Sequence, residues 1–248
     1  MSDVRLLADP EAVSRAAADD FVALARENVG RRGSFSVALS GGSTPRRLYQ
    51  LLAEAPRRTE VDWSRIDFFW GDERAVPPDH PDSNYGAAQA TLLGPVGAPA
   101  ERVHRINGEL PDAEQVAREY EAELARVLGA APGAPPPALD LILLGMGADG
   151  HTASLFPYSQ ALAERRRWAL SVYVARLGAA RITLTPPVLN RGREIRLLVT
   201  GHDKADALHE ALEGPREPER LPVQLIAPEA GRVVWLVDRA AASKLSGA

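Results

Sequence analysis

The sequence lacks cysteine entirely and contains no long apolar run. Without cysteine there can be no disulfide bridge, thiolate nucleophile or cysteine-based zinc site. No apolar run approaches the roughly 20 residues of a membrane-spanning helix. The first five residues do not form the basic region and apolar stretch of a secretory signal. We therefore expect a cytoplasmic protein with no membrane partner.

Lysine is also scarce, and the charge is slightly negative. Of the 29 lysine and arginine residues, only Lys204 and Lys244 are lysine, and the net charge of -4 gives no basic surface for nucleic acid. A small anionic ligand remains possible because it needs only a local group of donors. With 45% hydrophobic and 25% charged residues, the 248-residue chain has an ordinary globular composition. We expect no nucleic-acid partner, and a monomer rather than an obligate oligomer.

Helical and strand periodicities alternate along the chain, which is typical of βα units around a mainly parallel sheet. The pattern predicts helices that start at Asp9-Pro10, Thr44-Pro45 and Ser83, and others over 116–127 and 203–212. It predicts strands over 34–40, 66–70, 103–106, 139–144, 168–174, 195–200 and 233–237. The expected fold is a doubly wound, Rossmann-like α/β domain with helices on both faces. The Pro/Ala/Gly stretch 129–138 is either a surface loop or a boundary, and one domain over 1–248 is the economical interpretation.

Four polar clusters follow predicted strands, at residues 40–44, 71–74, 145–151 and 201–204. In an open α/β sheet, ligands bind outside the carboxyl ends of the strands. The sequence therefore predicts one pocket that all four clusters share.

The first cluster combines Gly41 and Gly42 with the hydroxyls of Ser43 and Thr44 at a predicted helix start. Glycines let the backbone approach an anion, and a helix amino terminus offers free N–H groups. The spacing matches neither a P-loop nor a dinucleotide fingerprint. The turn either binds phosphate or is a tight structural turn in which Thr44 caps the helix.

The third cluster places Asp149 and His151 two residues apart, among glycines, after the most hydrophobic strand. A carboxylate beside an imidazole can fix its tautomer and increase its basicity, as a general base requires. The alternative is that Asp149 caps the following turn and His151 lies on the surface.

The second and fourth clusters supply further charges. Asp72 and Arg74 follow a strand with aromatic side chains, and form either a site or a surface salt-bridge turn. Lys204 stands at a predicted helix start, where the helix dipole disfavours a cation. An anion beside Lys204 would account for this position.

Several of these segments resemble the 6-phosphogluconolactonase family, in the same order and over nearly the whole chain. They are the segments 39–45, 71–74, 145–157, 181–185, 200–205 and 221–223, with sequences LSGGSTP, GDER, GMGADGHTASLFP, RITLT, TGHDKA and LPV. The resemblance implies hydrolysis of 6-phospho-D-glucono-1,5-lactone to 6-phosphogluconate in the oxidative pentose phosphate pathway. It also implies a fold similar to that of glucosamine-6-phosphate deaminase.

Two positions separate the lactonases from the deaminases. Deaminases carry a catalytic glutamate where this chain has Phe156, and a tyrosine where it has Arg74. Both residues favour the lactonase. The stretch 174–180 departs from the proline-rich loop often found there in the family, which puts the pocket wall in question.

A δ-lactone is an activated ester, so hydrolysis needs a base for water, an oxyanion stabiliser and a grip on the phosphate. We assign these roles to His151 with Asp149, to Arg74 held by Asp72, and to a phosphate-binding set. That set comprises Gly41, Gly42, Ser43, Thr44, Arg181 and Lys204. Asp72 can alternatively hold a sugar hydroxyl, and Asp149 can contact the sugar.

No cofactor, metal or covalent intermediate is implied, because the chain lacks metal-ligand spacings and a Gly-x-Ser-x-Gly elbow. Two rival functions remain: a sugar-phosphate deaminase or isomerase, and a non-enzymatic sugar-phosphate sensor. A sensor that regulates transcription should carry a helix-turn-helix segment, and none precedes the first predicted strand.

Overall fold

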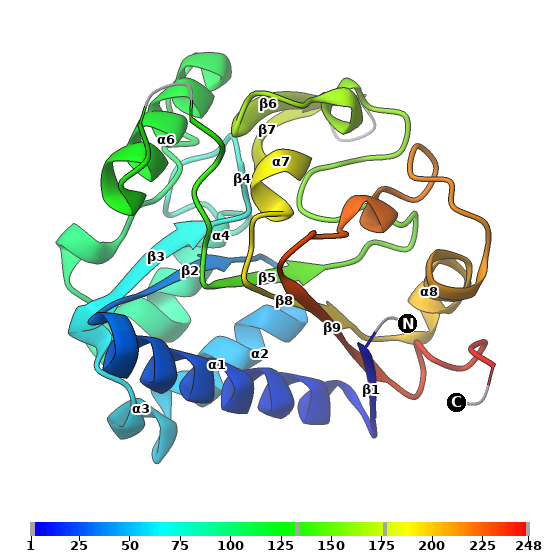
Figure 1. The fold of residues 1–248 in the computed structure, drawn as a ribbon, viewed down its shortest axis with the longest axis horizontal. Helices are drawn as coiled ribbons and strands as arrows, with labels where there is room; N and C mark the ends of the chain where they lie inside the picture. The colour runs from blue at the N-terminus through cyan, green and yellow to red at the C-terminus, as the bar shows by residue number, and fades with distance from the viewer. Residues whose placement is uncertain (1–2, 132–133, 176–177, 247–248) are drawn as a thin grey trace.

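A six-stranded parallel sheet crosses the middle of the molecule (Figure 1). The computed structural model describes residues 3–131, 134–175 and 178–246. The strand order is β1-β9-β8-β5-β2-β3. These strands are β1 (Asp3–Leu7), β2 (Phe35–Leu39), β3 (Ile66–Trp70), β5 (Leu141–Gly145), β8 (Glu194–Val199) and β9 (Arg232–Asp238).

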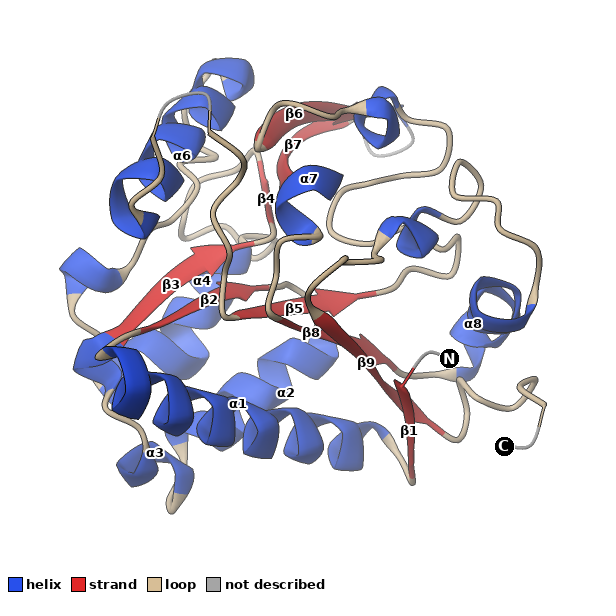
Figure 2. Ribbon diagram, in the orientation of Figure 1, coloured by secondary structure: helices blue, strands red, loops and turns tan. Residues whose placement is uncertain are grey.

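Both faces of this sheet are covered (Figure 2). On one face α1 and α2 pack against each other, and on the other lie α6, α7 and a second, antiparallel sheet in the order β4-β7-β6. The helices are α1 (Pro10–Arg32), α2 (Ser43–Ala53), α3 (Arg57–Glu60), α4 (Asn84–Ala88), α5 (Gly94–Val96), α6 (Ala113–Leu128), α7 (Pro186–Leu189) and α8 (Ala205–Glu213). The strands of the second sheet are β4 (Asp72–Arg74), β6 (Ala169–Val174) and β7 (Ala179–Leu184).

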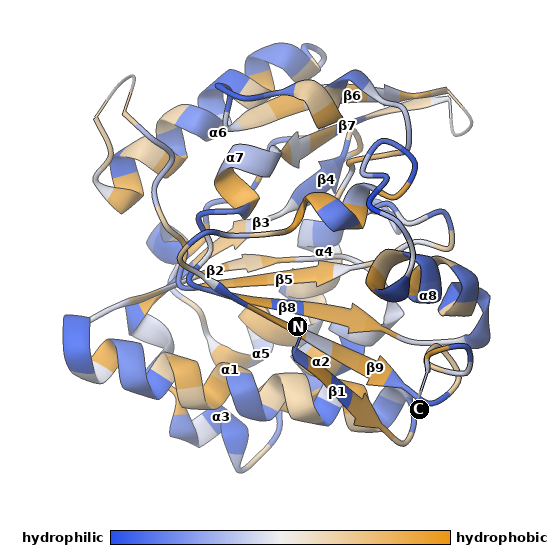
Figure 3. Cartoon of the chain, turned by 45° about the vertical axis from the view of Figure 1, so that its right-hand side comes forward, coloured by the Kyte–Doolittle hydropathy of each residue, from blue (hydrophilic) through white to orange (hydrophobic). Residues whose placement is uncertain are grey.

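Burial on both faces accounts for the continuous apolar runs in the sequence, since parallel strands with two covered faces have no solvated side. Every residue of β2 and β3 is buried, and Leu141 to Leu144 of β5 are completely inaccessible. Figure 3 shows the strands as mostly hydrophobic and the outer sides of the helices as mostly hydrophilic. The predicted α/β fold with a mainly parallel sheet is therefore confirmed, and the central position of β5 with it.

Two of the predicted helix caps are correct. The side chain of Asp9 accepts a hydrogen bond from the N–H of Ala12, and Ser83 accepts one from Gly86. The third is wrong: α2 starts two residues earlier, at Ser43 with Gly42 as its N-cap, and no side chain caps it. Thr44 is instead hydrogen-bonded to Thr200 across the sheet edge, with 2.8 Å between the hydroxyl oxygens.

The predicted strand over 103–106 is also wrong. Within this segment only Val103 forms a β-bridge, with Phe68, and the chain then leaves the sheet. The segment therefore contains one isolated bridge and no strand. Conversely, β1, β7 and the short polar strand β4 are additions to the predicted set. The three residues Asp72–Arg74 are all polar and show no strand periodicity. They form a strand because they pair with β7.

Within the described residues, no helix is long and apolar enough to cross a membrane. The buried hydrophobic side chains form one cluster that includes both sheets, from Val37 of β2 to Ile182 of β7. Residues 132–133 of the stretch 129–138, and residues 176–177 of the stretch 174–180, lie outside the described residues.

Candidate active site

The four polar clusters line one cavity of about 400 Å³ at the carboxyl edge of the parallel sheet. Its lining includes Ser40 to Thr44 after β2, Asp72 and Arg74 in β4, His151 after β5, and Lys204 after β8. Arg181 of β7 completes the wall. The cavity opens beside β2. The next strand of this sheet along the chain, β3, lies on one side of β2, and the strand after it, β5, lies on the other side. Such a switch in strand order leaves a crevice at the strand ends.

The turn after β2 depends on a close approach by Asn84. A Cβ atom on Gly41 would lie 1.9 Å from the side-chain oxygen of Asn84, so only glycine fits at position 41. Asn84 is itself buried and donates from its side-chain amide to the backbone and carboxylate oxygens of Asp72, at 2.9 and 3.3 Å. One asparagine thus connects the first cluster to the second.

Asp72 is a buried carboxylate with several partners. The hydroxyl of Ser154 donates to its Oδ2 at 2.6 Å, and Arg181 forms a longer ion pair with the same oxygen at 3.8 Å. Among the described residues the ion pair of Asp72 is thus with Arg181, whereas the sequence analysis paired Asp72 with Arg74. The antiparallel register places Thr183 opposite Asp72, so Arg181, two residues before Thr183, is the diagonal neighbour of Asp72 on the same face.

Arg74 is held by the loop that follows β4. One of its terminal nitrogens donates to the carbonyl of Asp82 at 2.6 Å, while its Nε is buried and has no hydrogen-bond partner among the described residues. The adjacent Glu73 is buried and accepts the N–H groups of Arg74, Asn84 and Tyr85 at 2.7–2.8 Å. Burial raises the pKa of Glu73, and these three N–H groups counteract part of that rise. Glu73 thereby folds the loop back so that Asn84 reaches Asp72.

His151 and Asp149 form a close pair. Nδ1 of the imidazole lies 2.5 Å from Oδ1 of Asp149, which also accepts the backbone N–H of His151 at 3.3 Å. A carboxylate can only accept, so Nδ1 carries a proton and Nε2 is the nitrogen available as a base. A Cβ atom on Gly147 would lie 2.0 Å from this Nδ1, so a side chain at position 147 would displace the imidazole. Asp149 is not among the described residues that line the cavity, so the carboxylate stands behind the imidazole.

Phe156 lies between the imidazole and a guanidinium. Its ring centroid is 4.5 Å from that of His151, and the Arg181 guanidinium carbon is 5.7 Å from it. The ring of Phe156 cannot accept a proton. It therefore only packs against its neighbours, whereas a glutamate at this position could act as a base. Arg181, which the sequence analysis assigned to the phosphate set, therefore stands beside Phe156 and Asp72.

Lys204 lies in a short 3-10 turn, His202–Lys204, directly before α8. Its ammonium is bonded to the mostly exposed carboxylate of Asp203 at 2.7 Å, and that hydrogen bond lowers the pKa of Asp203. The turn is anchored by the buried Asp238 at the end of β9, which accepts the N–H of Gly201 at 3.1 Å. Lys204 is thus held at the rim of the cavity.

Three side chains that shape the site were not predicted from the sequence: the buried Asn84 and Ser154, and the partly buried Thr200. Ser154 and Thr200 lie inside the quoted family segments, which was the available signal. Asn84 is the first residue of α4, directly after the predicted cap Ser83, and no motif in the sequence indicated that its side chain reaches the site.

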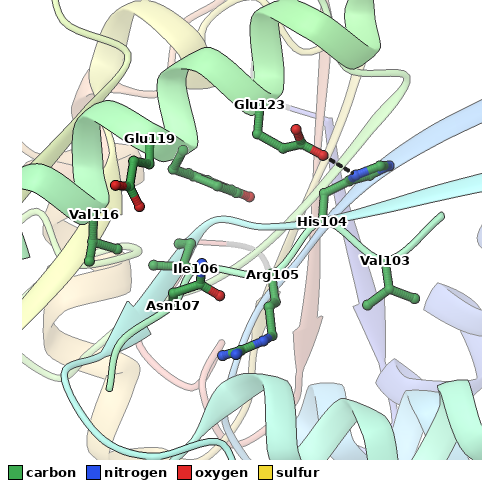
Figure 4. Close-up of a pocket in the computed structure, with 9 residues that line it drawn as sticks. Val103, His104, Arg105, Ile106, Asn107, Val116, Glu119 and Glu123 are labelled. Carbon is green, nitrogen blue, oxygen red and sulfur yellow. Dashed lines mark hydrogen bonds and ion pairs between the residues drawn. The ribbon is translucent and has the colours of Figure 1, made fainter. Parts of the chain in front are cut away.

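A second cavity of about 380 Å³ lies elsewhere, between α6 and the segment 103–107 (Figure 4). His104 lies in its wall, buried between Glu123 at 2.7 Å and Asp67 at 3.1 Å. Burial would raise the pKa of Asp67, but hydrogen bonds from His104 and Arg102 outweigh it and lower that pKa. These contacts tie β3 to α6, which is a structural role. Among the described residues, no group of three His, Asp or Glu side chains is arranged to hold a metal ion.

Comparison with known proteins identifies the family to which the chain is similar. Residues 8–235 match the family model described as glucosamine-6-phosphate isomerases/6-phosphogluconolactonase. The chain is 42% identical to a 6-phosphogluconolactonase of Synechocystis over 88% of its length and 87% of that protein. It superposes on the 6-phosphogluconolactonase from Trypanosoma cruzi with a TM-score of 0.87 and 31% identity, covering 99% and 97% of the two chains. A monomeric glucosamine-6-phosphate deaminase shares the fold, with a TM-score of 0.81, 24% identity and coverage of 98% and 99%.

Proposed function

The chain belongs to the glucosamine-6-phosphate isomerase/6-phosphogluconolactonase family, and on that premise we propose that it hydrolyses 6-phospho-D-glucono-1,5-lactone to 6-phosphogluconate. This is the lactone-opening step of the oxidative pentose phosphate pathway. One observation carries the proposal: a single cavity is lined by His151, whose Nδ1 is paired with Asp149 behind it, by Arg74, and by Lys204 at its rim. These are a base, an oxyanion donor and an anion-binding group.

In the proposed reaction, Nε2 of His151 takes a proton from water as the water oxygen attacks the lactone carbonyl. Asp149 holds the imidazole in the required tautomer through Nδ1. A positioned base of this kind contributes about 10²–10⁴-fold to the rate. The ring oxygen then leaves and receives the proton from the imidazolium, which gives the open-chain acid.

Arg74 stabilises the oxyanion that forms at the carbonyl. Its side chain lines the cavity, and a preorganised donor of this kind can contribute about 3–4 kcal/mol to the transition state. Asp72 takes no part in proton transfer; it fixes Arg181 and Ser154 around the site, or accepts from a sugar hydroxyl.

The phosphate lies at the other end of the cavity in this proposal. The backbone of Gly41 and Gly42, the hydroxyls of Ser43 and Thr44, and the ammonium of Lys204 line that end. Arg181 remains a member of the set, since its long ion pair with Asp72 allows the guanidinium to turn toward an anion. Binding energy from the unreactive phosphate then positions the lactone for attack.

We further propose that the protein acts in the cytoplasm as a single domain and a monomer, without cofactor, metal, membrane or nucleic-acid partner. The continuous hydrophobic core supports the single domain. The negative net charge of the protein and the small size of the proposed substrate favour a small-molecule partner over nucleic acid.

The test follows lactone disappearance by NMR, with and without enzyme, because the substrate also hydrolyses spontaneously. His151→Asn should lower kcat by about 10²-fold or more and leave KM nearly unchanged. The wild-type rate should rise with pH on its acidic limb, and the variant should lose that limb. His209→Asn in α8 serves as the control, since His209 is not in the described lining of the cavity.

Retention of most of the corrected kcat by His151→Asn would show that another group is the base. Release of ammonia from glucosamine 6-phosphate, without lactone hydrolysis, would instead establish the deaminase reaction. Phe156 argues against that outcome because it occupies the position of the deaminase glutamate. Binding of the sugar phosphate with no turnover of either compound would establish a sensor.

A further inference from the structure

Two buried tyrosine hydroxyls lie at the ends of the neighbouring strands β2 and β3. Tyr49 comes from α2, and its hydroxyl donates to the carbonyl of Ser40 at 2.7 Å and accepts the N–H of Ser40 at 3.0 Å. Tyr120 comes from α6, and its hydroxyl donates to the carbonyl of Trp70 at 3.0 Å and accepts its N–H at 2.7 Å. The two side chains make the same pair of bonds at equivalent places.

The sheet explains why these backbone groups need a partner. β2 pairs with β5 only at Val37 and Ala38, so the two strands have separated by the time the chain reaches Ser40. Trp70 ends β3, which is the edge strand of the sheet. A buried N–H and carbonyl left without partners would be costly, and one hydroxyl satisfies both because it donates and accepts.

The hydroxyls are fixed in this role by their surroundings. Tyr49 and Tyr120 are 1% and 3% exposed. Burial raises the pKa of both phenols, so they remain protonated and able to donate over the whole physiological range. Each therefore holds its strand end permanently.

Tyr49 holds Ser40, the first residue of the cluster 40–44, and Tyr120 holds Trp70, the last residue before the cluster 71–74. Ser40 precedes the turn from Gly41 to Thr44, and Trp70 precedes the segment from Asp72 to Arg74. Tyr49 also ties α2 back to the strand that leads into it, nine residues earlier. The position of the turn is thus set by its own helix, and that of the Arg74 segment by α6.

We propose that Tyr49 and Tyr120 are positioning residues with separate targets: Tyr49 places the phosphate-binding turn, and Tyr120 places the segment that carries Arg74. The inference rests on the proposed function for the meaning of the two targets. It predicts that loss of one hydroxyl affects substrate binding, and loss of the other affects turnover.

The experiment compares Tyr49→Phe and Tyr120→Phe, which remove only the hydroxyls. Tyr49→Phe should raise KM, and the inhibition constant of inorganic phosphate, by about tenfold with kcat little changed. Tyr120→Phe should lower kcat by about tenfold and leave the phosphate constant unchanged. A tenfold change corresponds to about 1.4 kcal/mol. Tyr173→Phe, at an exposed site in β6, is the matched control and should change neither.

The inference would be overturned if both variants had equal kinetic effects, or if they had a lower melting temperature with unchanged kinetics. Either result would show that the tyrosines have only a structural role. Neither result would contradict the lactonase activity proposed for the wild-type protein. If a variant does not fold, amide hydrogen exchange on the wild type decides. The amides of Ser40 and Trp70 should exchange slowly, and phosphate should protect the Gly41–Thr44 turn without affecting Trp70. Fast exchange at Ser40 and Trp70 would overturn the inference.

Discussion

Adding one methyl group at Gly147 should disable the imidazole without unfolding the protein. In Gly147→Ala the new Cβ would lie 2.0 Å from Nδ1 of His151, 2.2 Å from its Cε1 and 2.6 Å from Oδ1 of Asp149. An ordinary contact is 3.4 Å or more. The ring must therefore move by about 1.4 Å, the difference between these distances, and its hydrogen bond with Asp149 must break or turn.

The expected magnitude follows from that displacement. A misplacement of about 1 Å at a reacting group can cost about 10²-fold in rate, so kcat should fall by about that factor. Stability should change little, because Gly147 is not among the glycines with positive φ and alanine can adopt its backbone conformation. Alanine also reduces the entropy of the unfolded chain, and the resulting gain of about 0.4–1 kcal/mol in the free energy of unfolding offsets part of the cost of moving the ring.

The assay measures kcat and KM by lactone NMR, corrected for spontaneous hydrolysis, and the free energy of unfolding by urea titration. Gly30→Ala in α1 is the matched control, because a Cβ there meets nothing within 4 Å. It should leave kcat unchanged. A Gly147→Ala variant with wild-type kcat would refute the argument that this turn holds the imidazole by close contact.

Three further predictions concern the phosphate, Asp72 and pH. Lys204→Ala should raise KM for the phosphorylated lactone at least tenfold, about 1.4 kcal/mol, with no effect on unphosphorylated gluconolactone, and steady-state kinetics on both lactones checks this. Ser154→Ala removes a donor from the buried Asp72 and should lower the free energy of unfolding by about 1–3 kcal/mol in urea titration. Asp67→Asn should lower that free energy by about 2 kcal/mol at pH 7. Because the folded pKa of Asp67 is lowered, its contribution is present above about pH 4 and is lost as pH falls further, so the two stability curves should converge in acid and a constant gap would contradict the reasoning.

The sequence alone determined the class of fold and the four clusters. Apolar runs such as Leu141–Leu144 predicted buried parallel strands, since only a sheet covered on both faces tolerates them. Because all such strands end at one edge, polar residues directly after them had to gather there. Local patterns also predicted the caps Asp9 and Ser83, which depend on neighbouring residues only.

Tertiary structure decided every feature that depends on residues distant in the chain. Thr44 turned from the expected cap into a partner of Thr200, 156 residues away, because the sheet places the two hydroxyls 2.8 Å apart. Arg181 rather than Arg74 pairs with Asp72, since the register of β4 and β7 sets that choice. Asn84, at the start of α4, reaches Asp72 because the buried Glu73 accepts its backbone N–H. Periodicity encodes which face of a strand is buried, but these contacts depend on the order and register of strands, which a local pattern does not contain.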